Sequence, residues 1–367
     1  MSRVVRSIGV VAPGEPAILD VEEPDPGPGQ AWVRTEWSGV SAGTEVAIVR
    51  GTDPHHLLHW DPDLRSFDDD AGPPATYPVR ALGYMEVGRV TVSRTPELAE
   101  GQLVAMAYGH RTGVCADPSA RPVIPVPDDL DPLLGVYLAQ MGPICVNGLL
   151  HAAADAAGPG AGVDAGVRDR HVLVTGAGVI GLLSALLAVR HGADVVVAEP
   201  SAERRAVAEA LGLATLADDG SAWRAVKERW HHGRGDAGAD VVLQCRGHDA
   251  ALATGLKALR PQGTVVDLGF YQAGAEAVRL GEEFHHNGLA VVCAQVGRVP
   301  RGMADAWPRT ALAQVTLDLL RERGPEIRAH LVTDVLPFEE GPRLLADLAG
   351  RRLAAPPLQA VLSFPGG

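Results

Sequence analysis

The stretch from His171 to Leu183 constrains the fold of this chain more than any other. It has the pattern of a short apolar strand, a glycine-rich turn and the start of a helix. In the G-x-G-x-x-G spacing, the first glycine permits a tight turn, the second lets the backbone approach a pyrophosphate, and the third lets the helix pack closely on the strand. The helix N-terminus then faces the phosphates. The sequence therefore predicts a dinucleotide site, formed by Gly176, Gly178, Val179, Ile180 and Gly181.

A second apolar strand follows this helix and ends at Glu199, 18 residues after Gly181. A carboxylate at this place can bind the hydroxyls of the adenosine ribose, and its charge repels a 2′-phosphate. We therefore expect NAD as the cofactor. NADP is the alternative, because Arg204 and Arg205 lie close by and could bind a phosphate. An ordinary strand–helix–strand crossover without a ligand is the reading that this pattern disfavours.

Composition limits the possible partners. The 367 residues suggest two or three domains, and the net charge of −13 disfavours a nucleic-acid partner. We see no apolar run long enough to span a membrane and no signal-peptide pattern at the N-terminus. The four cysteines are far apart in the sequence and are expected to be reduced thiols of a cytoplasmic protein.

The rest of the chain divides into two patterns. Residues 1–110 are rich in short strands and turns, and residues 31–37 alternate as a half-buried strand does. Residues 239–294 alternate strands with helices, which predicts a parallel, doubly wound sheet. Residues 152–166 have the composition of a linker or loose loop. Residues 51–78 form a long loop that is either a surface insertion or a lid over the active site.

Several motifs along nearly the whole chain resemble the medium-chain dehydrogenase/reductase superfamily. They are Gly43-Thr44-Glu45, Gly83-x4-Gly88-x-Val90, Gly101-Gln102-Leu103-Val104, the glycine turn and the closing strand at 358–364. The resemblance implies an α/β protein with two domains and an active site in the cleft between them. A GroES-like β-barrel catalytic domain would comprise residues 1–145 and 298–367, and a Rossmann cofactor domain residues 146–297. Family members are usually dimers or tetramers, so a homodimer or homotetramer is expected.

Many members of that superfamily hold a catalytic zinc ion, and the three ligand positions differ here. They correspond to Ser41, Tyr84 and Gly142, which cannot together replace Cys, His and carboxylate ligands. We therefore expect a zinc-free protein. An unconventional site would have to use Glu45, Glu86 or His110.

The segment 38–45, followed by Gly83-Tyr84-x-x-x-Gly88-Arg89-Val90, resembles the bacteriochlorophyllide a dehydrogenase branch. That branch oxidises a secondary hydroxyethyl group. Met85 stands where a glutamate is expected, so its substrate is not carried over.

Without zinc, side chains must stabilise the substrate oxygen and move its proton. Thr44 has the position of a family hydroxyl that relays this proton, although a threonine before a helical turn is also a common N-cap. Tyr84 could donate to the substrate oxygen, or be an aromatic core residue. His110 could act as acid or base, or be structural. Glu45 could orient Tyr84. The candidate catalytic residues are therefore Thr44, Glu45, Tyr84 and His110.

By the same resemblance, the nicotinamide pocket would be lined by Gly269, Phe270, Ala294 and Val296. The sequence thus predicts an NAD(H)-dependent oxidoreductase acting on a secondary alcohol or ketone of a small polyol or natural-product intermediate. One alternative is a zinc-free enoyl or quinone reductase acting on a conjugated C=C bond. Another is a catalytically inactive nucleotide-binding protein.

Overall fold

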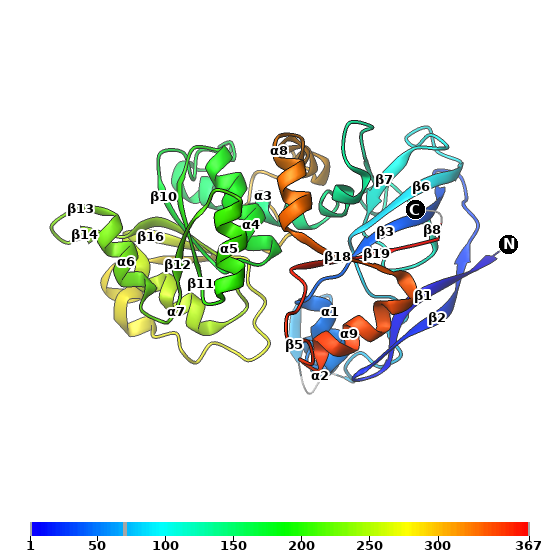
Figure 1. The fold of residues 1–367 in the computed structure, drawn as a ribbon, viewed down its shortest axis with the longest axis horizontal. Coiled ribbons are helices and arrows are strands. Elements are labelled where there is room, and N and C mark those ends of the chain that lie inside the picture. The colour runs from blue at the N-terminus through cyan, green and yellow to red at the C-terminus, as the bar shows by residue number, and fades with distance from the viewer. Residues whose placement is uncertain (1, 69–71, 366–367) are drawn as a thin grey trace. The chain divides into compact units, whose positions relative to one another are not determined.

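The computed structural model describes residues 2–68 and 72–365, and it divides the chain into two compact units. Unit 1 comprises Met1–Gln140 and Val332–Gly367, and unit 2 comprises Met141–Leu331. Within the described residues, no helix combines the length and apolar character that crossing a bilayer requires. Each unit has its own sheet, so the two are described separately (Figure 1).

Unit 2 is built on a six-stranded parallel sheet. The strands in chain order are β10 (His171–Thr175), β11 (Asp194–Glu199), β12 (Ala214–Ala217), β15 (Ala239–Gln244), β16 (Leu259–Asp267) and β17 (Ala290–Cys293). Their spatial order is β12-β11-β10-β15-β16-β17, which is the 3-2-1-4-5-6 order of a dinucleotide-binding fold. The predicted doubly wound parallel sheet is confirmed.

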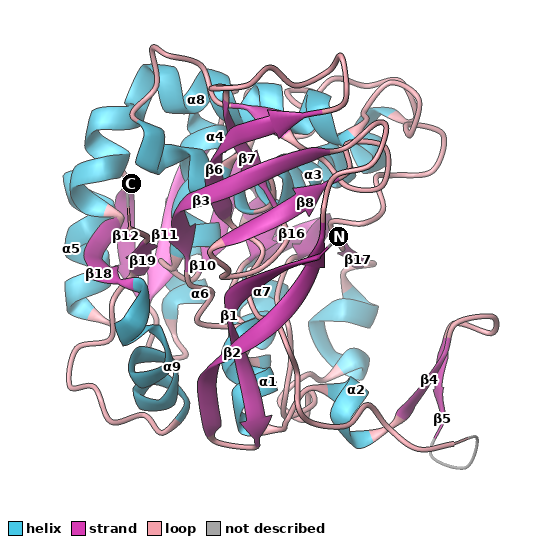
Figure 2. Ribbon diagram, turned by 90° about the vertical axis from the view of Figure 1, so that its right-hand side faces the viewer, coloured by secondary structure: helices cyan, strands magenta, loops and turns pink. Residues whose placement is uncertain are grey.

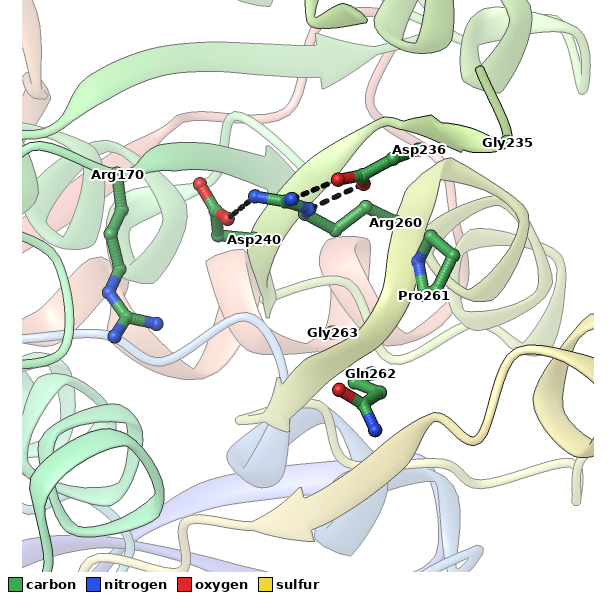
Figure 3. Close-up of a pocket in the computed structure, with 8 residues that line it drawn as sticks. All are labelled: Arg170, Gly235, Asp236, Asp240, Arg260, Pro261, Gln262 and Gly263. Atoms are coloured by element: carbon green, nitrogen blue, oxygen red, sulfur yellow. Dashed lines mark hydrogen bonds and ion pairs between the residues drawn. The ribbon is translucent and has the colours of Figure 1, made fainter. Parts of the chain in front are cut away.

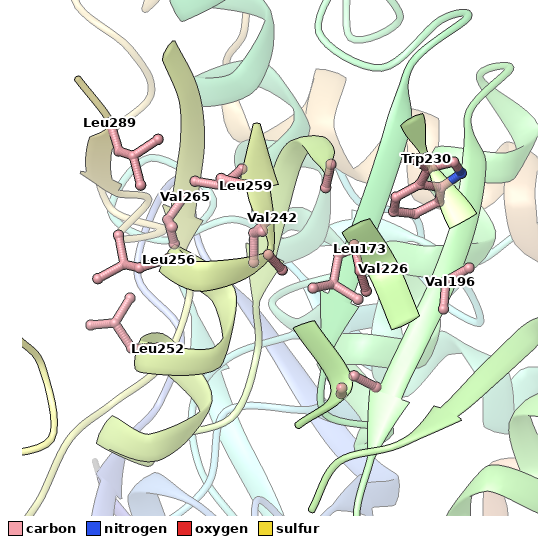
Figure 4. Close-up of a cluster of buried hydrophobic side chains, with 14 residues drawn as sticks. Leu173, Val196, Val226, Trp230, Val242, Leu252, Leu256, Leu259, Val265 and Leu289 are labelled. Carbon is pink, nitrogen blue, oxygen red and sulfur yellow. The ribbon is translucent and has the colours of Figure 1, made fainter. Parts of the chain in front are cut away.

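Helices and one small hairpin complete unit 2. The helices are α3 (Met141–Ala157), α4 (Val179–Arg190), α5 (Ala202–Ala210), α6 (Ala222–Arg229), α7 (Asp249–Ala258) and α8 (Arg309–His330), with a π-helical turn at Leu280–Phe284. The hairpin pairs β13 (His231–Gly233) with β14 (Asp236–Ala237). Apolar side chains of α6, α7 and the strands form one core, labelled in Figure 4 and including Leu173, Val226, Val242 and Leu256.

Unit 1 is built on a seven-stranded sheet, whose strands come from both the N-terminal and the C-terminal parts of the chain. The strands of this unit are β1 (Ser2–Ala12), β2 (Glu15–Pro24), β3 (Ala31–Gly39), β6 (Glu86–Ser93), β7 (Leu103–Met106), β8 (Gly113–Ala116), β9 (Ile124–Pro125), β18 (Val332–Pro337) and β19 (Gln359–Ser363). The sheet order is β18-β19-β3-β6-β7-β9, with β8 also paired to β3, while β1 and β2 form a separate long hairpin (Figure 2). The predicted closing strand is β19, and it pairs antiparallel with β3.

Short helices connect these strands. They are α1 (Thr44–Arg50), α2 (Pro54–Leu57), α9 (Gly341–Ala349) and 3-10 turns at Pro132–Tyr137 and Phe338–Glu340. The loop at 51–78 is not structureless, because it contains α2 and a hairpin of β4 (His59–Asp61) and β5 (Ser66–Asp68). Two aspartates of this loop, at positions 69 and 70, lie outside the described residues.

The second domain boundary differs from the expected one. Residues 298–331 stay in unit 2 and do not return to unit 1 at 298. The physical reason is the packing of α8 on α3, where a Cβ added at Gly142 would lie 2.0 Å from Thr316 Cγ2. The first boundary, expected between 145 and 146, lies at the start of α3, between 140 and 141. The predicted linker or loose loop at 152–166 starts later than expected, because α3 continues to Ala157, and residues 158–166 form coil and turns.

Candidate functional site

The glycine turn of unit 2 adopts the geometry that a dinucleotide phosphate needs. Gly176 has φ of +98°, which favours glycine, and α4 begins directly after Gly178. A Cβ at Gly181 would lie 1.8 Å from the carbonyl oxygen of Gly176, so any side chain there would break the turn. A Cβ at Gly178 would meet no described atom within 4 Å. Open space above Gly178 and the N-terminus of α4, with Val179 and Ile180, is therefore available to an anion.

Glu199 ends β11 beside this turn, as the spacing predicted. One carboxylate oxygen accepts the backbone N–H of Ala177 at 2.8 Å, and the other accepts that of Ser201 at 2.9 Å. The carboxylate is buried and held against the glycine turn. Each oxygen keeps a further lone pair that can accept a ribose hydroxyl.

The two arginines after β11 differ in how they are held. Arg205 donates to the carbonyl oxygens of Glu199 and Pro200, both at 2.7 Å. The Arg204 backbone N–H is capped by the Ser201 hydroxyl at 3.3 Å, which sets the start of α5. Arg205 is therefore committed to the backbone, and Arg204 is the better candidate of the two for a phosphate.

The residues predicted to line the nicotinamide pocket follow β16 and β17 at the same edge of the sheet. Gly269 donates its N–H to Asp267 Oδ1 at 2.9 Å, and Ala294 donates its N–H to the Asp267 carbonyl oxygen at 2.9 Å. Phe270 is 41% exposed. The Val296 carbonyl accepts from Arg309 at 3.1 Å. All of these lie beyond the carboxyl ends of parallel strands, where ligands bind in such sheets.

Two supporting residues of this edge were missed by sequence reasoning. Buried Asn147 donates to the carbonyl oxygens of Ala294, Gln295 and Arg298 at 3.2–3.3 Å, which fixes the loop after β17 on α3. Arg246 follows β15, and its Cβ lies 3.0 Å from the position a Gly176 Cβ would take. Neither residue belongs to a short motif, so only the fold reveals its place.

The catalytic candidates of unit 1 come together in one cluster. The Tyr84 hydroxyl donates to Ser41 Oγ at 2.5 Å. Thr44 is the first residue of α1 rather than its N-cap, which is Gly43. Burial raises the pKa of Tyr84, and the charge of Glu45 raises it further, while hydrogen bonds with Ser41 and Thr44 act in the opposite direction. Tyr84 is therefore a protonated hydroxyl at neutral pH, with Ser41 and Thr44 beside it.

A buried ionic network lies behind these hydroxyls. Glu45 accepts the Ser41 backbone N–H with Oε1 at 2.9 Å, and its Oε2 lies 2.8 Å from His110 Nε2. His110 Nδ1 lies 2.6 Å from Ser38 Oγ, which is 3.3 Å from Glu86 Oε1. Ser38 and Glu86 are paired in the register of β3 and β6. Hydrogen bonds thus connect Tyr84 to Ser41, Ser41 to Glu45, and Glu45 to His110.

Both ring nitrogens of His110 are occupied by protein partners, and the side chain is 0% exposed. Burial acts to lower the pKa of His110, but the charge and hydrogen bond of Glu45 and the charge of Glu86 outweigh burial and raise it. Burial raises the pKa of Glu86 above its usual range, although His110 and two backbone N–H groups act against this. His110 is therefore a buried partner of Glu45, and its ring is not exposed at the surface of the cluster.

The residues at the expected zinc-ligand positions do not fit zinc. Ser41 and Tyr84 are hydroxyls bonded to each other, and Gly142 has no donor atom and no room for one beside Thr316. Glu45, Glu86 and His110 are the remaining donors. In the part of the chain that the structure describes, they do not bring three ligand atoms within 4.8 Å of one another.

Comparisons with known proteins give a consistent picture. Residues 179–313 match the family model described as zinc-binding dehydrogenase. The chain is 31% identical over 166 residues to D-guloside 3-dehydrogenase of Escherichia coli, covering 42% of this chain and 46% of that protein. It is 40% identical over 110 residues to L-threonine 3-dehydrogenase of Pyrococcus horikoshii, covering 29% and 30%. The chain thus spans less than half the length of these relatives.

A solved structure shows that the likeness in fold extends over nearly the whole chain. It is a protein of Sinorhizobium meliloti described as a zinc-binding dehydrogenase bound to NADP, with a TM-score of 0.71 and 20% identity. The match covers 98% of this chain and 99% of that one.

Proposed function

We propose that this chain, which belongs to the medium-chain zinc-binding dehydrogenase family, is an NAD(P)(H)-dependent oxidoreductase that interconverts a secondary alcohol and a ketone without a catalytic metal. The observation that carries the proposal is the hydroxyl pair of Tyr84 and Ser41, backed by Glu45 and His110. These hydroxyls stand at two of the positions where the family resemblance places zinc ligands.

Unit 2 supplies the cofactor site in this proposal. The glycine turn and the N-terminus of α4 hold the pyrophosphate, and Glu199 accepts the adenosine ribose hydroxyls. When bound there, the nicotinamide ring would supply the hydride for the substrate carbon. We propose NAD(H) as the preferred cofactor because the Glu199 carboxylate repels a 2′-phosphate. NADP(H) is the alternative, which the NADP-bound relative and Arg204 support.

Unit 1 supplies the proton. As hydride reaches the carbonyl carbon, negative charge develops on the carbonyl oxygen, and Tyr84 turns its hydroxyl proton from Ser41 Oγ to that oxygen. The Tyr84 phenolate that remains then regains one proton from solvent before the next turnover. Ser41 and Thr44 hold the Tyr84 oxygen in place, and Glu45 fixes Ser41 through its backbone N–H. The raised pKa of Tyr84 keeps this hydroxyl protonated at neutral pH, so that it can act as the acid in ketone reduction.

The substrate class follows from two further lines of support. Two relatives are named as dehydrogenases of a guloside and of threonine at carbon 3. The resemblance of residues 38–45 to the bacteriochlorophyllide a dehydrogenase branch also supports a reaction at a secondary hydroxyl group. We propose a small polyol, a sugar derivative or a natural-product intermediate with a secondary hydroxyl.

The test is product analysis with NADH deuterated at nicotinamide C4. The purified chain is incubated with 3-keto glycosides, small ketones and conjugated enones, and the products are examined by NMR. The proposal predicts a secondary alcohol with deuterium on the carbinol carbon. Deuterium on a saturated former C=C bond would show an enoyl or quinone reductase instead. NADH binding without turnover of any compound would indicate an inactive nucleotide-binding protein.

A further inference from the structure

A cluster of two histidines and a carboxylate lies in unit 2, at the opposite edge of the sheet from the glycine turn. One ligand atom from each of His171, His232 and Asp240 lies within 4.8 Å of the others. His171 is the first residue of β10 and Asp240 the second of β15, whereas the glycine turn follows the last residue of β10. Because β10 spans five residues, the cluster is more than about 10 Å from the nucleotide site.

We propose that His171, His232 and Asp240 form a zinc-binding site that is separate from the cofactor and substrate sites. Two imidazole nitrogens and one carboxylate oxygen are a donor set that Zn²⁺ uses, with a fourth position left to water. The strand register supports the arrangement. Val172 pairs with Val241, so the preceding residues, His171 and Asp240, lie beside each other at the edge of the sheet.

The distances are close to those that zinc needs. His171 Nδ1 lies 3.6 Å from Asp240 Oδ2. Two ligand atoms on a tetrahedral zinc ion, with bonds of about 2.0–2.1 Å, are about 3.3 Å apart. His232 is an exposed residue on the small β13–β14 hairpin, so its side chain can make the remaining adjustment.

His171 offers a nitrogen that the described residues leave unused. Its Nδ1 atom is buried and has no hydrogen-bond partner in the part of the chain that the structure describes. The ring is held in place by stacking on Trp230, with ring centroids 5.1 Å apart. A buried nitrogen without a partner is costly, and a metal ion bound there would remove that cost.

The Asp240 carboxylate is held in place by hydrogen bonds from its neighbours. Asp240 accepts the His171 backbone N–H at 2.8 Å through Oδ2 and Arg260 at 2.9 Å through Oδ1. Arg260 is shared with Asp236, so two carboxylates face one guanidinium (Figure 3). Arg170 lines the same pocket, and Figure 3 shows its guanidinium turned away from Asp240. Asp240 is therefore held in a fixed orientation by its neighbours, with Oδ2 on the side of His171.

A bound zinc ion would join three segments that are distant in the sequence: β10, the β13–β14 hairpin and β15. The expected consequence is a more stable unit 2, because an ion that binds only the folded chain raises its stability. This role needs no contact with substrate and is independent of the proposed catalysis.

The experiment uses the full chain without an affinity tag, stripped with EDTA and titrated with ZnCl₂ by calorimetry. His232→Asn removes one exposed ligand, and His231→Asn is the matched control because His231 is an exposed neighbour on the same strand. We expect one zinc ion per chain for the wild type and for His231→Asn. His232→Asn should weaken zinc binding at least about tenfold.

Thermal melting gives a second readout that does not depend on activity. Zinc should raise the melting temperature of the wild type and of His231→Asn, and should not raise that of His232→Asn. The proposal is overturned if the wild type takes up no zinc, or if His232→Asn and His231→Asn bind zinc equally well. Zinc binding that is lost in His110→Gln and kept in His232→Asn would also overturn it, and would place the ion in unit 1.

Discussion

At the scale of single residues, the account depends most on the Tyr84 hydroxyl. Tyr84→Phe removes the proposed acid while keeping the ring, so we expect kcat for ketone reduction to fall by about 10²–10⁴. The dissociation constant for NADH should stay unchanged, because the cofactor site belongs to unit 2. Tyr108→Phe is the control, since its hydroxyl meets only the Asp117 backbone in the hydrogen bonds of the described residues. Equal kcat values for the two variants would exclude Tyr84 as the acid.

We expect the preference for NADH over NADPH to depend on a second single residue, Glu199. Glu199→Gln removes the charge that repels a 2′-phosphate and keeps one acceptor oxygen. The ratio of kcat/KM for NADH to that for NADPH should fall by about tenfold or more, equivalent to about 1.4 kcal/mol. Glu209→Gln, an exposed carboxylate on α5, should leave the ratio unchanged. Steady-state kinetics with both cofactors tests this, and an unchanged ratio for Glu199→Gln would contradict it.

Sequence reasoning identified Glu45, Tyr84 and His110 and suggested that Glu45 could orient Tyr84, whereas the Glu45 carboxylate bonds to the Ser41 backbone N–H and to His110. Glu45 and His110 are 65 positions apart, and Ser38 and His110 are 72 apart. Contacts of this kind depend on the register of β3 with β6 and on the loop after β7, which no local pattern specifies. The contacts of Ser38 with His110 and Glu86 could therefore be recognised only from the folded structure.

At the scale of elements, the glycine turn allows two substitutions with opposite outcomes. Gly181→Ala places a Cβ 1.8 Å from the Gly176 carbonyl oxygen, and we expect a loss of about 3 kcal/mol in stability. Gly178→Ala meets open space and has an ordinary extended backbone, with φ −81° and ψ −178°. Gly178→Ala should therefore fold normally but bind NADH at least about tenfold more weakly, because its methyl group occupies the pyrophosphate approach.

Urea unfolding and NADH fluorescence titration separate these two effects. Tight NADH binding by Gly178→Ala would show that no pyrophosphate lies over this turn. A fully stable Gly181→Ala would show that the turn relaxes more easily than its backbone distance indicates.

The elements themselves were predictable where local chemistry determines them. The glycine turn, β11 ending at Glu199 and the closing strand β19 all follow from short patterns of apolar residues and glycine. The end of unit 2 does not, because the sequence pattern changes near position 297 while α8 still packs on α3. That packing depends on Gly142 and Thr316, which are distant in sequence, so the boundary could not be read from either segment alone.

At the scale of the whole molecule, the buried network should make stability depend on pH. The pKa of His110 is raised above its ordinary value in the folded chain. Its contribution to stability is therefore complete below the unfolded-state pKa of about 6.5 and is lost as pH rises through the folded-state pKa. The difference in unfolding free energy between the wild type and His110→Gln should be larger at pH 6 than at pH 9. Urea unfolding at both values tests this, and a difference that grows with pH would contradict the raised pKa.

The central claim is that the proposed reduction by this chain uses protein hydroxyls and not a catalytic metal ion. The most direct measurement is NADH-dependent ketone reduction by the His232→Asn chain after exhaustive chelation, with metal content determined on the same sample. The His232→Asn background removes the proposed zinc site of unit 2 from the comparison. We predict unchanged kcat with less than about 0.1 zinc per chain, as expected for acid catalysis by a side chain. Activity that is lost on chelation and restored by one equivalent of Zn²⁺ would contradict the claim.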